Sequence, residues 1–380
     1  MDCNIKKEEN EIKIINIQKE ENIKMKLDKK NFNFELSAVI EINKGYNSYI
    51  KKVLELPGDR IGILYQIMYE KCLFYIYSSK IFKRITEFKN DFLDAIRIGD
   101  SSLALCDNNN IYLYKLINKE YELIQKIECY KKEEENHSFS KNYSYDTEIK
   151  FLYPLINEDL MACSYYDIKL YKKEKGKYLF CKSIVNEYFI KNIIETQPNT
   201  LVLFSMKTIG RGCLINGYMN YISLYNLQND EKKILSENFS FHDGYEKYQI
   251  SRLQKIDHLL FAIYEGCLDI YDIQQNMKLI NESDYIIMEG IGLYKRKKKL
   301  KNELPFKYFK IWINNDFILA EDWDGKSFLY KYEDKSFKKY EEFPFNLKEA
   351  GIMKLKNNKL IIYSNDKIKV INSKTFLIKI

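Results

Sequence analysis

Glycine and proline are scarce in this chain, which has 14 Gly and 5 Pro among its 380 residues. The sequence holds no P-loop, no dinucleotide-binding glycine pattern and no Gly-x-Ser-x-Gly segment, so it lacks the common motifs of phosphate cradles and serine hydrolases. Histidine is limited to His137, His242 and His258, with no Cys or carboxylate at ligand spacing. We therefore expect no metal site, no cofactor and no Cys/His nucleophile.

Long apolar runs are also absent, since no stretch approaches the 18 residues that a membrane-spanning helix needs. The first nine residues, Met1–Glu9, contain no apolar segment typical of a secretory signal. The eight cysteines form no Cys-x-x-Cys pair, which favours buried thiols in a reducing compartment. These observations predict a cytoplasmic protein. Positive charges exceed negative ones only mildly, 61 against 54, which does not by itself indicate a nucleic-acid partner.

A short pattern recurs eight times along the chain. An apolar strand is followed by a polar turn and then by a second strand that reads apolar-x-apolar, usually followed by Tyr. Repeats of this kind predict stacked or radially arranged units. The second strands are Phe74–Tyr77, Ile111–Tyr114, Ile168–Tyr171, Ile222–Tyr225 and Leu268–Tyr271, with looser copies at Ser327–Tyr330, Ile368–Ile371 and Ile23–Lys26.

The first strands of these hairpins set a period. Their anchor residues lie 42, 57, 41, 59, 57 and 43 residues apart. The three longer intervals contain insertions at 131–147, 206–220 and 286–307, and the second of them is predicted to interrupt its hairpin. Without the insertions the period is about 42 residues, the size of a four-stranded propeller blade. The anchors are Ile61, Leu103, Leu160, Leu201, Leu260, Phe317 and Leu360.

Four strands, a to d, can be assigned within one repeat. The second repeat gives Phe92–Ile98, Ser102–Cys106, Ile111–Leu116 and Tyr121–Glu128. The short alternating runs favour strands throughout, and no segment of helical period competes. Because glycine is rare, Asn, Asp and Lys are expected to form the turns, with positive φ at the b–c hairpins. The sequence therefore predicts an all-β propeller.

The N-terminal region departs from the repeat. Residues 22–42 align with strands c and d but have no complete repeat before them. Because closure removes exposed sheet edges, we expect Phe34–Ile42 to pair with the last repeat and close a propeller of seven blades. Alternatively, Thr375–Ile380 is the outer strand of the seventh blade, and the N-terminal strands belong to an eighth. We expect a charged tail at residues 1–21 and a single domain at 22–380.

In their period and strand pattern these repeats resemble the WD-repeat β-propellers, over nearly the whole chain. No Gly-His pair opens a repeat, and the Trp-Asp ending of strand c is replaced mostly by Tyr and a variable residue, as in Tyr271-Asp272. Trp323-Asp324 falls at a b–c turn and so departs from the family's pattern. The resemblance implies a rigid, usually non-catalytic platform that presents loops to other proteins.

One insertion carries a basic run of six cations in seven residues: Lys295, Arg296, Lys297, Lys298, Lys299 and Lys301. Such a run can bind the phosphates of nucleic acid or anionic lipid, or serve as a nuclear-import signal. It can equally be a solvated loop that keeps the protein soluble.

Loop tips are the other candidate contacts, namely Asn109, Tyr165, Tyr166, Trp323 and Asp324. The acids of Glu321–Asp324 lie beside an indole, as in carbohydrate sites, but cleavage of a sugar needs two carboxylates across one cleft. The expected function is a non-catalytic protein-interaction scaffold on the b–c and d–a loops. The alternatives are a binder of anionic polymers or membrane surfaces through residues 295–301, and a propeller hydrolase.

Overall fold

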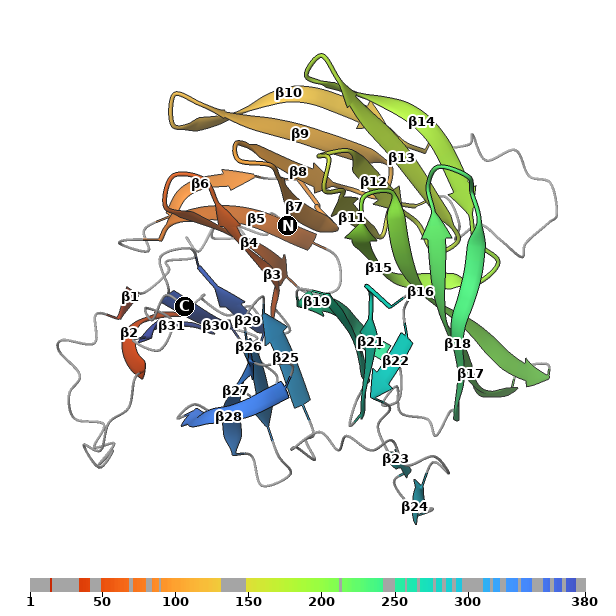
Figure 1. Cartoon of the computed structure of the whole chain (residues 1–380). Coiled ribbons are helices and arrows are strands. Elements are labelled where there is room, and N and C mark those ends of the chain that lie inside the picture. Colours follow the sequence, from red (N-terminus) through yellow and green to blue (C-terminus); the bar gives the residue numbers. More distant parts are fainter. Residues whose placement is uncertain are drawn as a thin grey trace, which may run out of the picture. The chain divides into compact units, whose positions relative to one another are not determined.

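A computed structural model gives the arrangement of the chain (Figure 1). It describes residues 14–15, 34–41, 49–67, 71–79, 84–88, 90–130, 148–211, 214–241, 250–256, 258–264, 267–275, 278–281, 285–288, 292–295, 310–314, 317–321, 326–333, 336–343, 351–355, 359–363 and 367–373. All regular elements in these ranges are β-strands, and none of them contains a helix that could cross a membrane. The chain divides into two compact units, residues 1–97 with 347–380, and residues 98–346.

The first unit contains two sheets that draw on both ends of the sequence. One is a four-stranded meander of β3 (Tyr49–Leu56), β4 (Arg60–Ile67), β5 (Lys71–Ser78) and β6 (Arg84–Phe88). The other has the order β1-β2-β31-β30-β29, formed by Ile14–Ile15, Phe34–Glu41, Lys367–Ser373, Lys359–Tyr363 and Gly351–Lys354. The boundary between the units falls within β7, the first strand of the next sheet.

The remaining four-stranded sheets repeat the same meander, in which strands a to d follow one another in chain order. The first comprises β7 (Asp94–Ile98), β8 (Ser102–Cys106), β9 (Asn110–Ile117) and β10 (Glu120–Glu128). The next comprises β11 (Phe151–Pro154), β12 (Leu160–Cys163), β13 (Asp167–Glu174) and β14 (Lys177–Val185). It is followed by β15 (Phe189–Gln197), β16 (Thr200–Arg211), β17 (Leu214–Asn226) and β18 (Lys232–Phe241).

Two further meanders and a hairpin complete the described sheets. They are β19 (Ile250–Ile256), β20 (Leu259–Tyr264), β21 (Cys267–Asp272) and β22 (Lys278–Asn281), then β25 (Lys310–Asn314), β26 (Phe317–Glu321), β27 (Ser327–Glu333) and β28 (Ser336–Phe343). Between them lies the two-stranded hairpin of β23 (Tyr285–Met288) and β24 (Gly292–Lys295). The prediction of an all-β chain built from four-stranded repeats is confirmed.

The predicted anchors lie at or next to the start of strand b in every repeat. Those whose side chains are described are fully buried: Ile61, Leu103, Leu160, Leu201, Leu260 and Leu360. Strand b is apolar along its length because it is covered on both sides; β12, for example, is buried at all four residues. The period read from the anchors is therefore the repeat of the buried strand.

A β-bulge recurs where strand c pairs with the outer strand d. In β9 and β10, Leu113 pairs with Gln125 and Tyr114 pairs with Leu123, so one extra residue stands on the outer strand. Six of the seven c–d pairs, including β31 with β2, have it at the same step of the repeat. The seventh, β17 with β18, has its bulge at Ile222/Ser223. A bulge twists a strand and disturbs its free edge, which protects the outer strand from edge-to-edge association.

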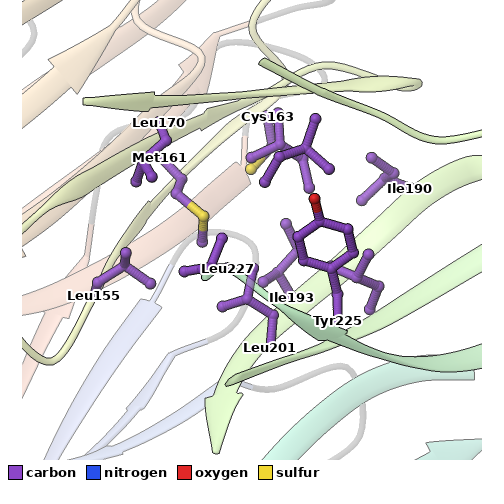
Figure 2. Close-up of a cluster of buried hydrophobic side chains, with 12 residues drawn as sticks. Leu155, Met161, Cys163, Leu170, Ile190, Ile193, Leu201, Tyr225 and Leu227 are labelled. Atoms are coloured by element: carbon purple, nitrogen blue, oxygen red, sulfur yellow. The ribbon is translucent and has the colours of Figure 1, made fainter. Parts of the chain in front are cut away.

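Neighbouring sheets within each unit pack through apolar clusters. In the second unit, Figure 2 shows the cluster between β11–β14 and β15–β18. Met161 and Cys163 of β12 meet Leu201 of β16 and Tyr225 of β17 there. In the first unit, residues of β3–β5, such as Ile61, pack with residues of β30 and β31, such as Ile361. Each fully buried aliphatic side chain contributes roughly 1.5–3 kcal/mol of burial free energy.

The turns use the residue types predicted, but at different hairpins. Positive φ occurs at Asp59, Asn118, Lys119, Asn199 and Asp230, as well as at Glu158, Lys175 and three glycines. All of these lie in a–b or c–d turns. The two described b–c turns have no positive φ, so the prediction of left-handed residues is wrong for the turn at Asn108–Asn110. The predicted turns at 265–266, 324–325 and 365–366 lie outside the described residues.

The N-terminal strand pairs with the last strand of the chain, as predicted. β2 runs antiparallel to β31, from Phe34 opposite Ser373 to Glu41 opposite Lys367. β31 therefore has β30 on one side and β2 on the other. Thr375–Ile380, the outer strand of the alternative, lies outside the described residues. Within the predicted tail, Ile14 and Ile15 pair with β2 as a short fifth strand. The predicted strand at Ile23–Lys26 lies outside the described residues.

Two of the predicted insertions contain strands. Residues 206–220 lengthen the β16–β17 hairpin instead of interrupting it, because the pairing continues from Thr200–Asn226 to Arg211–Leu214, with one register shift between Ile209 and Gly210. Thr, Ile, Leu and Tyr in this segment suit strands. The insertion at 286–307 holds most of the β23–β24 hairpin. The insertion at 131–147 lies outside the described residues.

Candidate functional site

The b–c turns in the first half of the second unit are fixed to the d–a connections beside them. The carbonyl of Asn109 accepts hydrogen bonds from the N–H groups of Cys129 (2.8 Å) and Tyr130 (3.2 Å). In the next sheet the carbonyl of Tyr165 accepts from Ile190 (2.6 Å), and the carbonyl of Tyr166 accepts from Asn186 (2.8 Å). Backbone pairing of this kind holds the loop tips in one position, as a recognition surface requires.

Side chains close the b–c turns in place of left-handed residues. The Asp107 carboxylate accepts hydrogen bonds from the N–H groups of Asn109 (2.8 Å) and Asn110 (2.6 Å) and from the Tyr112 hydroxyl (2.8 Å). Ser164 stands at the same place in the next repeat, and its hydroxyl accepts from the N–H of Asp167 (2.9 Å). Both are side-chain-capped turns, which supply the bend without positive φ.

Replacing Asp107 with alanine is expected to lower the free energy of unfolding by about 1 kcal/mol at neutral pH, because the turn loses its acceptor. Burial alone raises the pKa of Asp107, but the hydrogen bonds from Asn109, Tyr112 and Asn110 hold this pKa below its usual value. Because the pKa of Asp107 is lower in the folded protein than in the unfolded chain, where it is about 3.9, the charged carboxylate stabilises the folded state above that unfolded-state value. This stabilisation is lost as the pH falls through the pKa of the folded state.

Urea unfolding between neutral pH and about pH 3 measures this contribution, with the substitution Asp107→Asn as control. Asparagine keeps an acceptor oxygen without a titrating group. The difference in the free energy of unfolding between Asp107→Asn and wild type should therefore shrink in acid. An Asp107→Ala cost that stays constant over the whole pH range would contradict the role of the charge.

A stacked aromatic pair lies where the β12–β13 turn meets the entry into β15. The rings of Tyr165 and Phe189 are 3.9 Å apart at an angle of 27°. An ammonium group lies against each ring, with Lys150 Nζ 4.6 Å from the Tyr165 centroid and Lys191 Nζ 4.5 Å from the Phe189 centroid. The edge of Tyr166 packs against Phe189 at 5.9 Å. Both stacking and cation–π contacts orient these side chains.

A second stacked pair follows directly along the chain. The rings of Tyr188 and Tyr221 lie 4.1 Å apart and nearly parallel, at 7°. Lys232 Nζ lies 5.3 Å and Lys207 Nζ 5.8 Å from the Tyr188 centroid. The Lys232 ammonium also donates to Asn186 Oδ1 at 2.7 Å. Burial lowers the pKa of Lys232, and the charge of Glu187 opposes that shift.

We name these two stacks with their lysines the aromatic–lysine surface. Four of its aromatic side chains are only half-buried although they are ordered by ring and hydrogen-bond contacts. Half-exposed Tyr and Phe on rigid loops are typical of protein-binding surfaces, in which aromatic residues are enriched. Its members are Lys150, Tyr165, Tyr166, Tyr188, Phe189, Lys191, Lys207, Tyr221 and Lys232.

The predicted loop-tip residues divide into three groups. Tyr165 and Tyr166 belong to the aromatic–lysine surface, whereas Asn109 serves chiefly as a backbone acceptor within its turn. Trp323 and Asp324 lie outside the described residues. Tyr188 and Phe189 were not among the predicted contacts, although two adjacent aromatic residues at the entry into a strand are a visible signal.

The basic run is described only at its start. Lys295 is the last residue of β24 and pairs with Tyr285. Arg296, Lys297, Lys298, Lys299 and Lys301 lie outside the described residues. In the part of the chain that the structure describes, no three His, Cys, Asp or Glu side chains gather as metal ligands would.

No family model matches the sequence, and no curated protein matches it. Solved structures do resemble the fold. A chain in the crystal structure of a mitotic checkpoint complex has a TM-score of 0.55 and 10% sequence identity, over 91% of this chain and 96% of that chain. The Saccharomyces cerevisiae protein Sqt1 has a TM-score of 0.47 and 9% identity, over 86% and 96% of the two chains.

The first of these neighbours, with the TM-score of 0.55, is a WD40 propeller protein. The chain therefore has an all-β propeller fold, and the expected resemblance to WD-repeat propellers is confirmed at the level of the fold. A fold of this type supports many unrelated functions, so the function has to be argued from the surface itself.

Proposed function

We propose that this chain is a non-catalytic scaffold that binds other proteins. We further propose a single propeller of seven blades over residues 22–380, closed by the pairing of β2 with β31. The likeness to WD40 propellers, which usually act as interaction platforms, supports the class of function. The pairing of β2 with β31 supports the closure.

The aromatic–lysine surface carries the proposal. One ring stack joins the b–c turn to the start of β15, where the Ile190 N–H also donates to the Tyr165 carbonyl (2.6 Å). The other stack joins the d–a connection, at Tyr188, to Tyr221 of β17. A partner that covers these rings gains apolar contact without first having to order the loops. Aromatic side chains at the centre of such surfaces commonly supply the largest share of the binding free energy.

The test is quantitative affinity capture from the native cell, with the double substitution Tyr165→Ala, Phe189→Ala. Removing one ring stack is expected to reduce capture of the direct partner at least 10-fold, since truncating a central aromatic residue costs about 2 kcal/mol or more. The matched control is Leu179→Ala, Phe180→Ala, which removes exposed apolar side chains from the outer strand β14 (50% and 59% exposed).

The urea midpoint of each variant shows whether it is folded. Undiminished capture by the Tyr165/Phe189 variant would contradict the proposed surface. Loss of capture only after deletion of residues 296–301 would support the alternative in which the basic run binds an anionic partner.

A further inference from the structure

Beside the aromatic–lysine surface, part of β16 has a paired strand on only one side among the described residues. β15 begins at Phe189, which pairs with Met206, whereas β16 continues to Arg211 and stays paired with β17 on its other side. On the β15 side, no strand among the described residues pairs with positions 207–211. The long strands β16 and β17 are visible in Figure 1.

The open edge has a definite length, and the β16–β17 ladder beside it shifts register once, between Ile209 and Gly210. In this region β16 is the edge strand of three, because it pairs with β17, and β17 pairs with β18 as far as Gly217 opposite Phe241. Five residues of strand span about 16 Å. Every second residue of such an edge directs its N–H and C=O groups outward, which is the pattern that an additional strand satisfies.

Positive charge predominates around the edge, although Glu187 lies near Lys232 and Tyr221, and Glu237 lies near Tyr221. Residues 206–220 include Lys207 and Arg211 but no Asp or Glu. At the base of the edge, Lys207 lies over the ring of Tyr188, and Lys191 and Lys150 lie on the neighbouring stack. Lys191, Lys207 and Lys232 are all exposed. An approaching segment with carboxylates therefore meets complementary charge both along the edge and at its base.

We propose that residues 207–211 of β16 accept an extended acidic segment of a partner protein as an additional strand. This inference rests on the proposed function and names the chemistry of the partner. Main-chain hydrogen bonds to β16 align the segment, and its carboxylates pair with Lys207 and the lysines of the aromatic–lysine surface. A peptide fits this edge better than a nucleic acid, because only a polypeptide backbone matches the ladder of N–H and C=O groups.

The experiment measures fluorescence anisotropy of a labelled decapeptide of alternating Glu and Val with the full chain. We expect saturable binding at least about 10-fold tighter than that of the Lys–Val decapeptide, and weaker binding when NaCl rises from about 0.05 to about 0.5 M. Two further Glu–Val peptides carry N-methyl groups either on the valines or on the glutamates. Strand addition predicts that one of them binds much more weakly than the other, because only alternate N–H groups face β16.

Substitutions in the protein locate the site. Lys207→Glu is expected to weaken binding of the Glu–Val peptide about 10-fold, whereas Lys207→Ala weakens it at most about 5-fold, the range of one exposed ion pair. The matched control is Lys172→Glu, a charge reversal at an exposed lysine near the c–d turn of the preceding sheet. This control should bind within about 2-fold of wild type.

Three results would overturn the inference: no saturable binding of the Glu–Val peptide, equal effects of both N-methyl patterns, or equal effects of Lys207→Glu and Lys172→Glu. A disulfide-linked dimer of the variant Thr208→Cys would also overturn it, because a second copy of the chain would then occupy the edge. Partner capture that depends on Tyr165 and Phe189 while the peptide fails to bind would leave the proposed function standing and reject only this inference.

Discussion

Replacing Leu201 with alanine is expected to lower the free energy of unfolding by about 3 kcal/mol. Leu201 is fully buried in the cluster between the β11–β14 and β15–β18 sheets, where it lies among Met161, Ile193 and Leu227 (Figure 2). Truncation removes its burial free energy and leaves a cavity that two hydrogen-bonded sheets cannot readily close. Urea unfolding followed by tryptophan or far-UV signals measures the loss as a shift of the midpoint at constant slope.

The control for this prediction is Leu179→Ala. Leu179 is 50% exposed on the outer strand β14, so its truncation should cost less than about 1 kcal/mol. Both substitutions remove the same atoms from strands of neighbouring sheets, and they differ in burial. Similar shifts of the two midpoints would show that Leu201 does not lie in a packed cluster.

The sequence reveals the repeat because the buried strand is its most regular part. Strand b is enclosed on both sides, so it reads as an unbroken apolar run such as Leu160–Cys163. The outer strands are mostly exposed; β10, for example, has no fully buried residue, and its alternation is correspondingly weak. A one-residue bulge on these strands cannot be read from residue types, since it depends on the register with strand c.

The candidate site was only half visible in the sequence. Tyr165 and Tyr166 stand out as aromatic residues in a turn, but the ring that stacks on Tyr165 belongs to Phe189, beyond the whole of strands β13 and β14. Long-range pairs of this kind follow from the packing of loops and not from local propensity. Residues 206–220 show a different kind of error. The irregular spacing of the repeat predicted an interruption of the hairpin there, but β16 and β17 continue through this segment.

The pairing of the two ends of the chain leads to the largest expected effect on stability. Deleting residues 1–41 removes β2 and exposes the edge of β31, whose Ile368, Val370 and Ile371 are fully buried. Two of these side chains, Ile368 and Val370, belong to the cluster that joins β31 to β3–β5. Partial exposure of this cluster and loss of the β2–β31 hydrogen bonds are together expected to cost on the order of 3–6 kcal/mol. An uncovered strand edge also favours association between chains.

Urea unfolding and light scattering of the truncated chain test this prediction, and deletion of residues 1–11, which retains β1 and β2, is the control. The truncated chain should unfold at a lower urea concentration and scatter more light, whereas the control should match wild type. A synthetic peptide of residues 34–41, added in excess, should restore part of the midpoint because it can occupy the vacated edge. An unchanged midpoint after removal of β2 would mean that the pairing of the two ends contributes little to the stability of this fold.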